Sequence, residues 1–214
     1  MTDVVIINPN STASMTAAMV QVASRAVPAV RFEGWTSRKG PPAIQGTADG
    51  DAATPPLLEL VARASAEGYD GIIIGCFDDT GLRQAAEISA CPVIGIGQAS
   101  YHYAALRQWR FSVVTTLSVS VPVLETNIRS SGLDASLGRV RASEVPVLEL
   151  EKDPGQAGSA IRAEAMKAQS EDDIAAVVLG CAGMVQVVSD VRQALDIEVI
   201  DPVECAARCM TWLT

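Results

Sequence analysis

The sequence predicts an α/β protein with two pseudo-symmetric lobes, each built on a four-stranded parallel sheet. Short β-branched runs alternate with Ala-rich amphipathic stretches along the 214 residues, which is typical of parallel sheets covered by helices. The alternation repeats at about half the chain, because Cys76 and Cys181 follow equivalent apolar runs and lie 105 residues apart (181 − 76). Hydrophobic residues make up 49% of the chain and aromatic residues 4%, so the core must consist mainly of aliphatic side chains.

Eight strands are expected where β-branched residues cluster in short runs. In chain order they are residues 3–8, 30–35, 71–76, 92–96, 111–116, 138–142, 175–181 and 198–201. Eight helices are expected where apolar residues recur at helical spacing, at residues 14–26, 52–67, 80–89, 99–108, 120–131, 157–168, 184–194 and 203–213. We assign residues 1–98 to the first lobe and 99–202 to the second, and we expect residues 203–214 to complete the first lobe.

The charge of the chain excludes several classes of partner. The net charge is −9 and the isoelectric point about 4.6, and no basic cluster is denser than Arg38-Lys39, so we expect no nucleic-acid partner. No stretch approaches the roughly 18 apolar residues of a membrane span, and the first residues lack the basic start of a secretory signal. We therefore expect a cytoplasmic protein without a membrane partner.

The cysteines do not suggest a disulfide framework or a metal site. Five cysteines occur without CxxC spacing, at positions 76, 91, 181, 205 and 209. The chain has a single histidine, His102, so clustered ligands for zinc are lacking and no metal is expected. Cys91, Cys205 and Cys209 are interpreted as packing residues.

Cys76 and Cys181 have the same position in the two halves, within GCFDDTGL and GCAGM. Each lies at the carboxyl end of the third strand of its lobe, where doubly wound sheets place their ligand sites. If the lobes face one another, the active site lies in the cleft between them and the two thiols meet across it. The alternative is that both are small buried core residues, as free cysteines often are.

Polar turns accompany both thiols. Asn10 and Ser11 follow the first strand, and Thr115 and Thr116 have the equivalent place in the second half. Backbone amides next to Cys181, at Ala182 and Gly183, should favour the reactive thiolate of that residue. Past Cys76, the carboxylates of Asp78 and Asp79 are also compatible with a plain helix cap. The segment 40–54 is long enough to close over the cleft as a lid, and is equally compatible with a surface loop.

Six motifs together resemble a known group. They are INPNST with Met15-Thr16 close behind, GPPAIQG, GCFDDTGL, PVIGIGQAS, RFSVVTTL and VVLGCAGM. The ordered set, from Ile6 to about Asp201, resembles the hydantoin and allantoin racemases of the aspartate/glutamate racemase superfamily. Gly95-Ile96-Gly97, within the fourth motif, lacks the third glycine of a dinucleotide-binding fingerprint.

The resemblance implies two flavodoxin-like lobes around a cleft, no cofactor, and two cysteines that act on opposite faces of a chiral carbon. Motif by motif, Cys76 and Cys181 take the catalytic positions. The resemblance implies that the substrate, a cyclic ureide, is held by Asn10, Ser11, Ile44, Phe77, Asp78, Asp79, Thr115, Thr116, Ala182 and Gly183.

Two departures from the family pattern concern the substrate. The amino-acid racemase branch usually carries Cys-Thr-His after its second cysteine, whereas Ala182-Gly183-Met184 follow here, which favours a neutral cyclic ureide. Asp78 stands where a small residue is common and Thr80 where proline is common. An extra carboxylate would repel anionic substrates and change which ring substituent is accepted.

The leading hypothesis is therefore cofactor-independent racemisation of 5-substituted hydantoins, allantoin included, by two cysteines that serve as base and acid. An amino-acid racemase or a maleate-type isomerase of the same superfamily is the alternative within this scaffold. A thiol-redox protein and a catalytically silent binding module remain as alternatives from other classes. Helical faces rich in Ala and Val lead us to expect a homo-oligomer.

Overall fold

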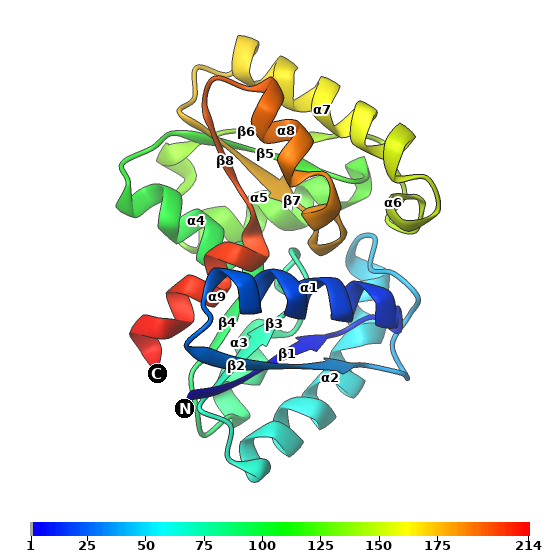
Figure 1. Ribbon diagram of the computed structural model, residues 1–214, viewed down its shortest axis with the longest axis vertical. Helices are drawn as coiled ribbons and strands as arrows, with labels where there is room; N and C mark the ends of the chain where they lie inside the picture. The colour runs from blue at the N-terminus through cyan, green and yellow to red at the C-terminus, as the bar shows by residue number, and fades with distance from the viewer. Residues whose placement is uncertain (1) are drawn as a thin grey trace.

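The computed structural model describes residues 2–214 and contains two parallel four-stranded sheets, one above the other (Figure 1). The strand order is β2-β1-β3-β4 in the first sheet and β6-β5-β7-β8 in the second, so the two lobes have the same topology. The strands are β1 (Thr2–Asn8), β2 (Val30–Thr36), β3 (Gly71–Ile74), β4 (Val93–Gly95), β5 (Phe111–Thr115), β6 (Leu137–Ala142), β7 (Ala176–Gly180) and β8 (Glu198–Ile200). The predicted fold class is confirmed.

Helices cover the sheets and connect the strands. The α-helices are α1 (Ala13–Ala26), α2 (Thr47–Glu67), α3 (Leu82–Ile88), α4 (Ile96–Leu106), α5 (Val121–Ser130), α6 (Glu149–Lys152), α7 (Pro154–Glu171), α8 (Val188–Ala194) and α9 (Pro202–Leu213). Three short 3₁₀ helices are η1 (Ser118–Ser120), η2 (Asp134–Ser136) and η3 (Ala182–Gln186). None of the helices within residues 2–214 is long and apolar enough to cross a membrane.

The central strands explain why their sequences read as continuous apolar runs. Every residue of β3, β5 and β7 is buried, because helices cover both faces of each sheet. In the first lobe, Ile73 contributes to the core that extends into the second lobe, whereas Ile72 and Ile74 pack under α2. Neighbouring residues of a strand therefore serve two different cores.

The last helix, α9, lies at the junction of the two lobes (Figure 1). It packs against α1 and β3 of the first lobe and against α4, which leads from the first lobe into the second. Met210 of α9 fills the space above Gly71, where a Cβ atom would come within 2.6 Å of its sulfur. The expected lobe boundary after residue 98 falls within the first turn of α4.

Several predicted boundaries were wrong. Helix α2 begins at Thr47 and not at 52, so residues 47–54 belong to the helix and not to the loop that was considered as a lid. Strands β3 and β7 end before Cys76 and Cys181, at Ile74 and Gly180. The predicted helix 184–194 is divided into η3 and α8, and the short helix α6 was not predicted.

A buried ion cluster stabilises the second lobe. Arg141 of β6 is 7% exposed and donates hydrogen bonds to Asp172, Glu164 and Glu171. Burial acts to raise the pKa of Asp172, but hydrogen bonds from Arg141 and Ser112 outweigh it and lower that pKa below its usual value. The Asp172 carboxylate therefore depends on the guanidinium.

We predict that Arg141→Ala lowers the free energy of unfolding by about 3–5 kcal/mol, because it leaves a buried carboxylate without its partner. Urea denaturation followed by circular dichroism measures this loss. Lys39→Ala is the matched control, since the Lys39–Glu59 pair is exposed and should contribute little. An Arg141→Ala variant as stable as this control would contradict the prediction.

Candidate active site

A small cavity of about 30 Å³ lies between the lobes, and both Cys76 and Cys181 line it. Cys76 follows β3 of the first lobe and Cys181 follows β7 of the second, so the two thiols reach the cavity from equivalent positions. The other lining residues are Asn10, Met15, Ile44, Gly75, Phe77, Asp78, Thr115, Thr116, Ser120, Val147, Gly180, Ala182 and Gly183. The site therefore lies at the carboxyl ends of the strands, as in other open parallel sheets.

The glycine before each cysteine allows the chain to turn close to its neighbours. A Cβ atom on Gly75 would lie 2.6 Å from the Met19 sulfur, and one on Gly180 would lie 2.9 Å from a methyl group of Val113. A larger residue at either position would displace the cysteine that follows. The repeated Gly-Cys pair thus has a packing reason in each lobe.

The two thiols differ in their hydrogen bonds. Thr80 donates its hydroxyl to the Cys76 sulfur at 3.4 Å, and the Asp78 amide also favours the thiolate of Cys76. The amides of Gly183 and Met184, at the start of η3, favour the thiolate of Cys181. Each sulfur can therefore accept hydrogen bonds if it loses its proton.

Burial nevertheless favours the protonated form of both thiols. It raises the pKa of Cys181 to about 12, with a further contribution from the charge of Asp78, and the nearby amides do not compensate. Burial and Asp78 likewise raise the pKa of Cys76 above its usual range. The amides past Cys181 do favour its thiolate, as expected, but desolvation is the larger effect and the net pKa is raised.

Asn10 is held rigidly at the cavity wall. Its Oδ1 accepts hydrogen bonds from Nδ2 of Asn8 (2.9 Å) and from the amide of Thr12 (2.9 Å), and its own amide donates to Oδ1 of Asn8 (3.1 Å). Ser11 does not line the cavity; its amide donates to the carbonyl of Pro41 (2.9 Å) and anchors the loop after β2. Ser11 therefore supports this loop through its backbone amide.

Thr115 and Thr116 line the cavity from the end of β5. The Thr115 hydroxyl donates to the carbonyl of Gly180 at 3.1 Å, directly before Cys181. Thr115 thereby couples the ends of β5 and β7. The hydroxyl pair is placed where the sequence predicted it.

Asp79 was expected at the substrate, but it points away from the cavity. Its Oδ1 accepts a hydrogen bond from the amide of Gly97 (3.1 Å) at the start of α4, and the Gln98 amide also favours its charged form. A Cβ atom on Gly95 would collide with this carboxyl group, and one on Gly97 would lie 2.8 Å from its Oδ2. The two glycines of Gly95-Ile96-Gly97 therefore make room for the side chain that fixes the Cys76 loop to α4.

Five lining residues are outside the predicted set: Met15, Gly75, Ser120, Val147 and Gly180. Gly75 and Gly180 directly precede the two cysteines. Met15 lies in the first turn of α1 and Ser120 at the equivalent helix start after β5, so the repeat offered a signal for both. Val147 comes from the segment between β6 and α6, and its sequence context offers no such signal. Its position depends on the tertiary structure alone.

Two loops close the cavity. The Val147 amide donates to Oε1 of Gln45 at 2.9 Å, which joins the second lobe to the loop after β2, and Ser14 of α1 donates to Glu151 of α6 at 2.8 Å. A volume of about 30 Å³ suits one or two water molecules, not a five-membered ring. In this conformation the cavity is therefore smaller than a ring-sized ligand.

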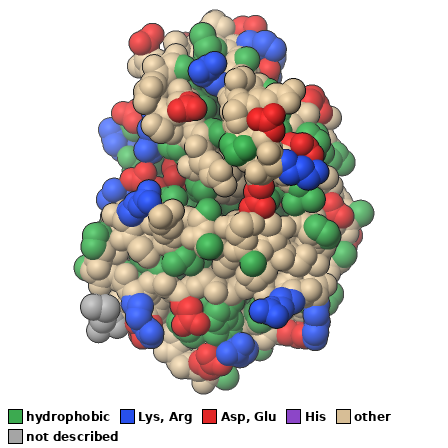
Figure 2. Space-filling model, turned by 45° about the vertical axis from the view of Figure 1, so that its right-hand side comes forward, with side chains coloured by type: hydrophobic (Ala, Val, Ile, Leu, Met, Phe, Trp, Pro, Cys, Tyr) green, Lys and Arg blue, Asp and Glu red, His purple; other side chains and the backbone are tan. Residues whose placement is uncertain are grey.

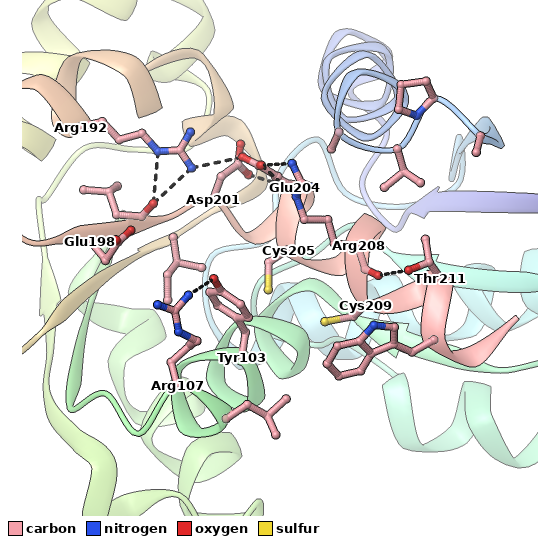
Figure 3. Close-up of a pocket in the computed structure, with 18 residues that line it drawn as sticks. Tyr103, Arg107, Arg192, Glu198, Asp201, Glu204, Cys205, Arg208, Cys209 and Thr211 are labelled. Carbon is pink, nitrogen blue, oxygen red and sulfur yellow. Dashed lines mark hydrogen bonds and ion pairs between the residues drawn. The ribbon is translucent and has the colours of Figure 1, made fainter.

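A larger groove of about 930 Å³ runs along α9 (Figure 3). Cys205 and Cys209 project from one side of this helix, and Arg192 and Arg208 are paired with Glu204. Because both thiols belong to one helix face, they cannot approach a bound carbon from opposite sides. Despite its size, this groove lacks the geometry that the small cavity has.

Comparisons with known proteins agree with this arrangement. A family model described as Asp/Glu/hydantoin racemase matches residues 4–210. A hydantoin racemase from Rhizobium meliloti is 40% identical over 204 residues, which cover 95% of this chain and 85% of that protein. The structure of an allantoin racemase from Klebsiella pneumoniae superimposes with a TM-score of 0.94 at 32% identity, covering 100% of this chain and 87% of the other. The structure of an allantoin racemase from Pseudomonas fluorescens superimposes with a TM-score of 0.93 at 31% identity, covering 99% of this chain and 90% of the other.

We predict that Gly95→Ala destabilises the protein by about 1–3 kcal/mol, because the added methyl group collides with the Asp79 carboxyl group. Thermal unfolding followed by circular dichroism measures the effect. Gly50→Ala serves as control, since Gly50 lies inside α2 and a Cβ atom there would have the Thr80 hydroxyl oxygen, 3.9 Å away, as its nearest neighbour. Equal stability of the two variants would show that Asp79 does not need this space.

We also predict that Asp78→Asn makes Cys76 and Cys181 react faster with iodoacetamide between pH 7 and 10. The negative charge of Asp78 raises the pKa of both thiols, so its removal lowers both pKa values and increases the thiolate fraction at a given pH. Peptide mass spectrometry measures the rates, with Cys91, which does not line the cavity, as internal control. Unchanged pH profiles at both thiols would refute the electrostatic role of Asp78.

Proposed function

The chain belongs to the Asp/Glu/hydantoin racemase family, and we propose that it racemises 5-substituted hydantoins by proton transfer between Cys76 and Cys181. The observation that carries this proposal is the position of the thiols. Each follows the third strand of its own lobe, and both line one cavity. A carbon bound between two lobes can be approached from two faces, as inversion of its configuration requires.

The proposed reaction needs a base on one face of C5 and an acid on the other. One cysteine, as thiolate, removes the C5 proton, and the electron pair of the C–H bond moves onto the neighbouring carbonyl oxygen. The opposite thiol then donates its proton to C5, the carbonyl re-forms, and the protonation states of the two cysteines are exchanged. The mirror-image substrate uses the two groups in reverse order.

The cavity also offers hydrogen-bond donors for the oxygen that gains charge. The backbone amide of Gly183 and the side chain of Asn10 line the cavity, and Thr116 adds a hydroxyl. Fixed donors of this kind lower the energy of an enolate-like transition state in an enclosed site. We assign these groups to the ring carbonyls.

The charge of the lining favours a neutral ring over a free amino acid. No Lys or Arg side chain from residues 2–214 lines the cavity, whereas Asp78 does. An amino-acid carboxylate would therefore lack a cationic partner and would face a carboxylate. The amino-acid racemase and the maleate-type isomerase are less compatible with this lining.

We further propose that the protein forms a homo-oligomer. Leu106 of α4 is 65% exposed and Trp212 of α9 is 77% exposed, and both border the groove along α9 (Figure 3). On the face shown in Figure 2, by contrast, acidic and basic side chains are interspersed among polar and apolar ones. Size-exclusion chromatography with light scattering tests this proposal.

We predict that Cys76→Ser and Cys181→Ser each reduce racemisation by at least about 100-fold, because a serine hydroxyl cannot replace a thiol as base or acid. Circular dichroism follows the loss of optical activity of a single hydantoin enantiomer, and NMR in heavy water follows exchange of the C5 proton. Cys91→Ser, outside the cavity, should keep its activity. A fully active Cys76→Ser or Cys181→Ser variant would refute the two-thiol mechanism.

A further inference from the structure

Asp78 lines the cavity although the two-thiol reaction does not use its carboxylate. Its negative charge raises the pKa of both Cys76 and Cys181 and so opposes formation of the thiolate that the reaction needs. A neutral side chain would avoid this effect. The presence of a carboxylate here therefore calls for a role in binding.

The backbone of Asp78 is fixed while its carboxylate remains available. Nδ2 of Asn127, in α5 of the second lobe, donates to the Asp78 carbonyl at 2.8 Å. The carboxylate itself accepts one long hydrogen bond among the described residues, from the Ser120 hydroxyl to Oδ2 at 3.4 Å. Oδ1 thus retains its full capacity to accept a hydrogen bond.

Asp79 provides a contrast within the same loop. Its carboxyl group accepts a hydrogen bond from the Gly97 amide at the start of α4, and the absence of side chains at Gly95 and Gly97 leaves space for it. Burial raises the pKa of Asp78 to about 6, partly offset by the Ser120 hydrogen bond, so the group is ionised at pH 8. A partly buried carboxylate that has no cationic partner is strongly stabilised when a ligand donates an N–H hydrogen bond to it.

Asp78 lines the same small cavity as both thiols, and its Oδ2 lies beside Ser120 of that lining, so the carboxylate lies near a carbon bound between the thiols. The groups next to that carbon in a hydantoin are the ring N1–H, a ring carbonyl and the first atoms of the substituent. A carbonyl oxygen would be repelled by Asp78. The ring N–H is common to all hydantoins, so only a donor on the substituent can distinguish one hydantoin from another.

We infer that Asp78 is a specificity-determining residue that accepts a hydrogen bond from an N–H group on the C5 substituent. This inference rests on the proposed function. It assigns the enzyme to hydantoins with a ureido, amide or ammonium substituent, and it disfavours alkyl and especially anionic substituents.

Three substrates test the inference: allantoin with its ureido group, 5-isopropylhydantoin, and 5-carboxymethylhydantoin with its anionic group. Initial racemisation rates give kcat/KM for the unmodified protein and for Asp78→Asn. A changed thiol pKa affects all three substrates alike, so ratios of kcat/KM between substrates isolate the binding role. Asp173→Asn is the charge-matched control, since its side chain is exposed and Asn tolerates the left-handed backbone there (φ 50°).

We expect Asp78→Asn to reduce the preference for allantoin over 5-isopropylhydantoin by about 10- to 100-fold, the loss typical of a hydrogen bond to a charged group. The relative rate with 5-carboxymethylhydantoin should rise about tenfold or more. Asp78→Ser, which cannot mimic the carboxylate oxygens, should change the ratios of kcat/KM between substrates in the same direction as Asp78→Asn. Asp173→Asn should leave these ratios unchanged.

Equal changes for all three substrates would overturn the inference, because they would place Asp78 at the ring N–H or in a purely electrostatic role. Unchanged ratios in both Asp78 variants would overturn it as well. If the unmodified protein racemises none of the three, the proposed function itself has failed, and this outcome is recognised before any variant is compared.

Discussion

Packing of three aromatic rings, from Phe77, Tyr101 and Phe111, holds the two halves of the candidate site in place. Phe77 follows Cys76 in the first lobe, Tyr101 belongs to the connecting helix α4, and Phe111 begins β5 of the second lobe. Tyr101 meets Phe77 edge-on at 5.5 Å and stacks on Phe111 at 5.9 Å between ring centroids. Since each lobe supplies one thiol, the distance between the thiols depends on this contact, which uses aromatic residues in a chain that has few.

Stability and reactivity oppose one another at the cavity. Enclosure between the lobes excludes water, which strengthens hydrogen bonds to a developing charge, but the same enclosure raises the pKa of both thiols. Local amides and the Thr80 hydroxyl offset only part of this effect. Hydrogen bonds of Gln45 with Val147 and of Ser14 with Glu151 connect the lobes beside the cavity, and Met15 and Ala43 of the first lobe share an apolar cluster with Val147 of the second.

Sequence reasoning succeeded where the local pattern has a direct structural meaning. The continuous apolar runs of β3, β5 and β7 predicted buried parallel strands, and the spacing of Cys76 and Cys181 placed both thiols at equivalent strand ends. Sequence reasoning failed where contacts with distant segments of the chain determine the position of a side chain. Asp79 was expected to face the substrate, and the start of α4, with Gly95 and Gly97, takes it instead. Segment 47–54 was expected in a loop, and it forms the beginning of α2.

The sequence by itself determined the two parallel sheets, the repeat and the position of a thiol in each lobe, because periodicity and strand ends are local properties of the chain. Only the tertiary structure decided that Val147 lines the cavity, that Ser11 and Asp79 do not line it, and that Asp78 keeps a carboxylate oxygen without a hydrogen-bond donor among the described residues. The tertiary structure also sets the pKa values of the two thiols, because their desolvation depends on atoms that many separate segments bring together.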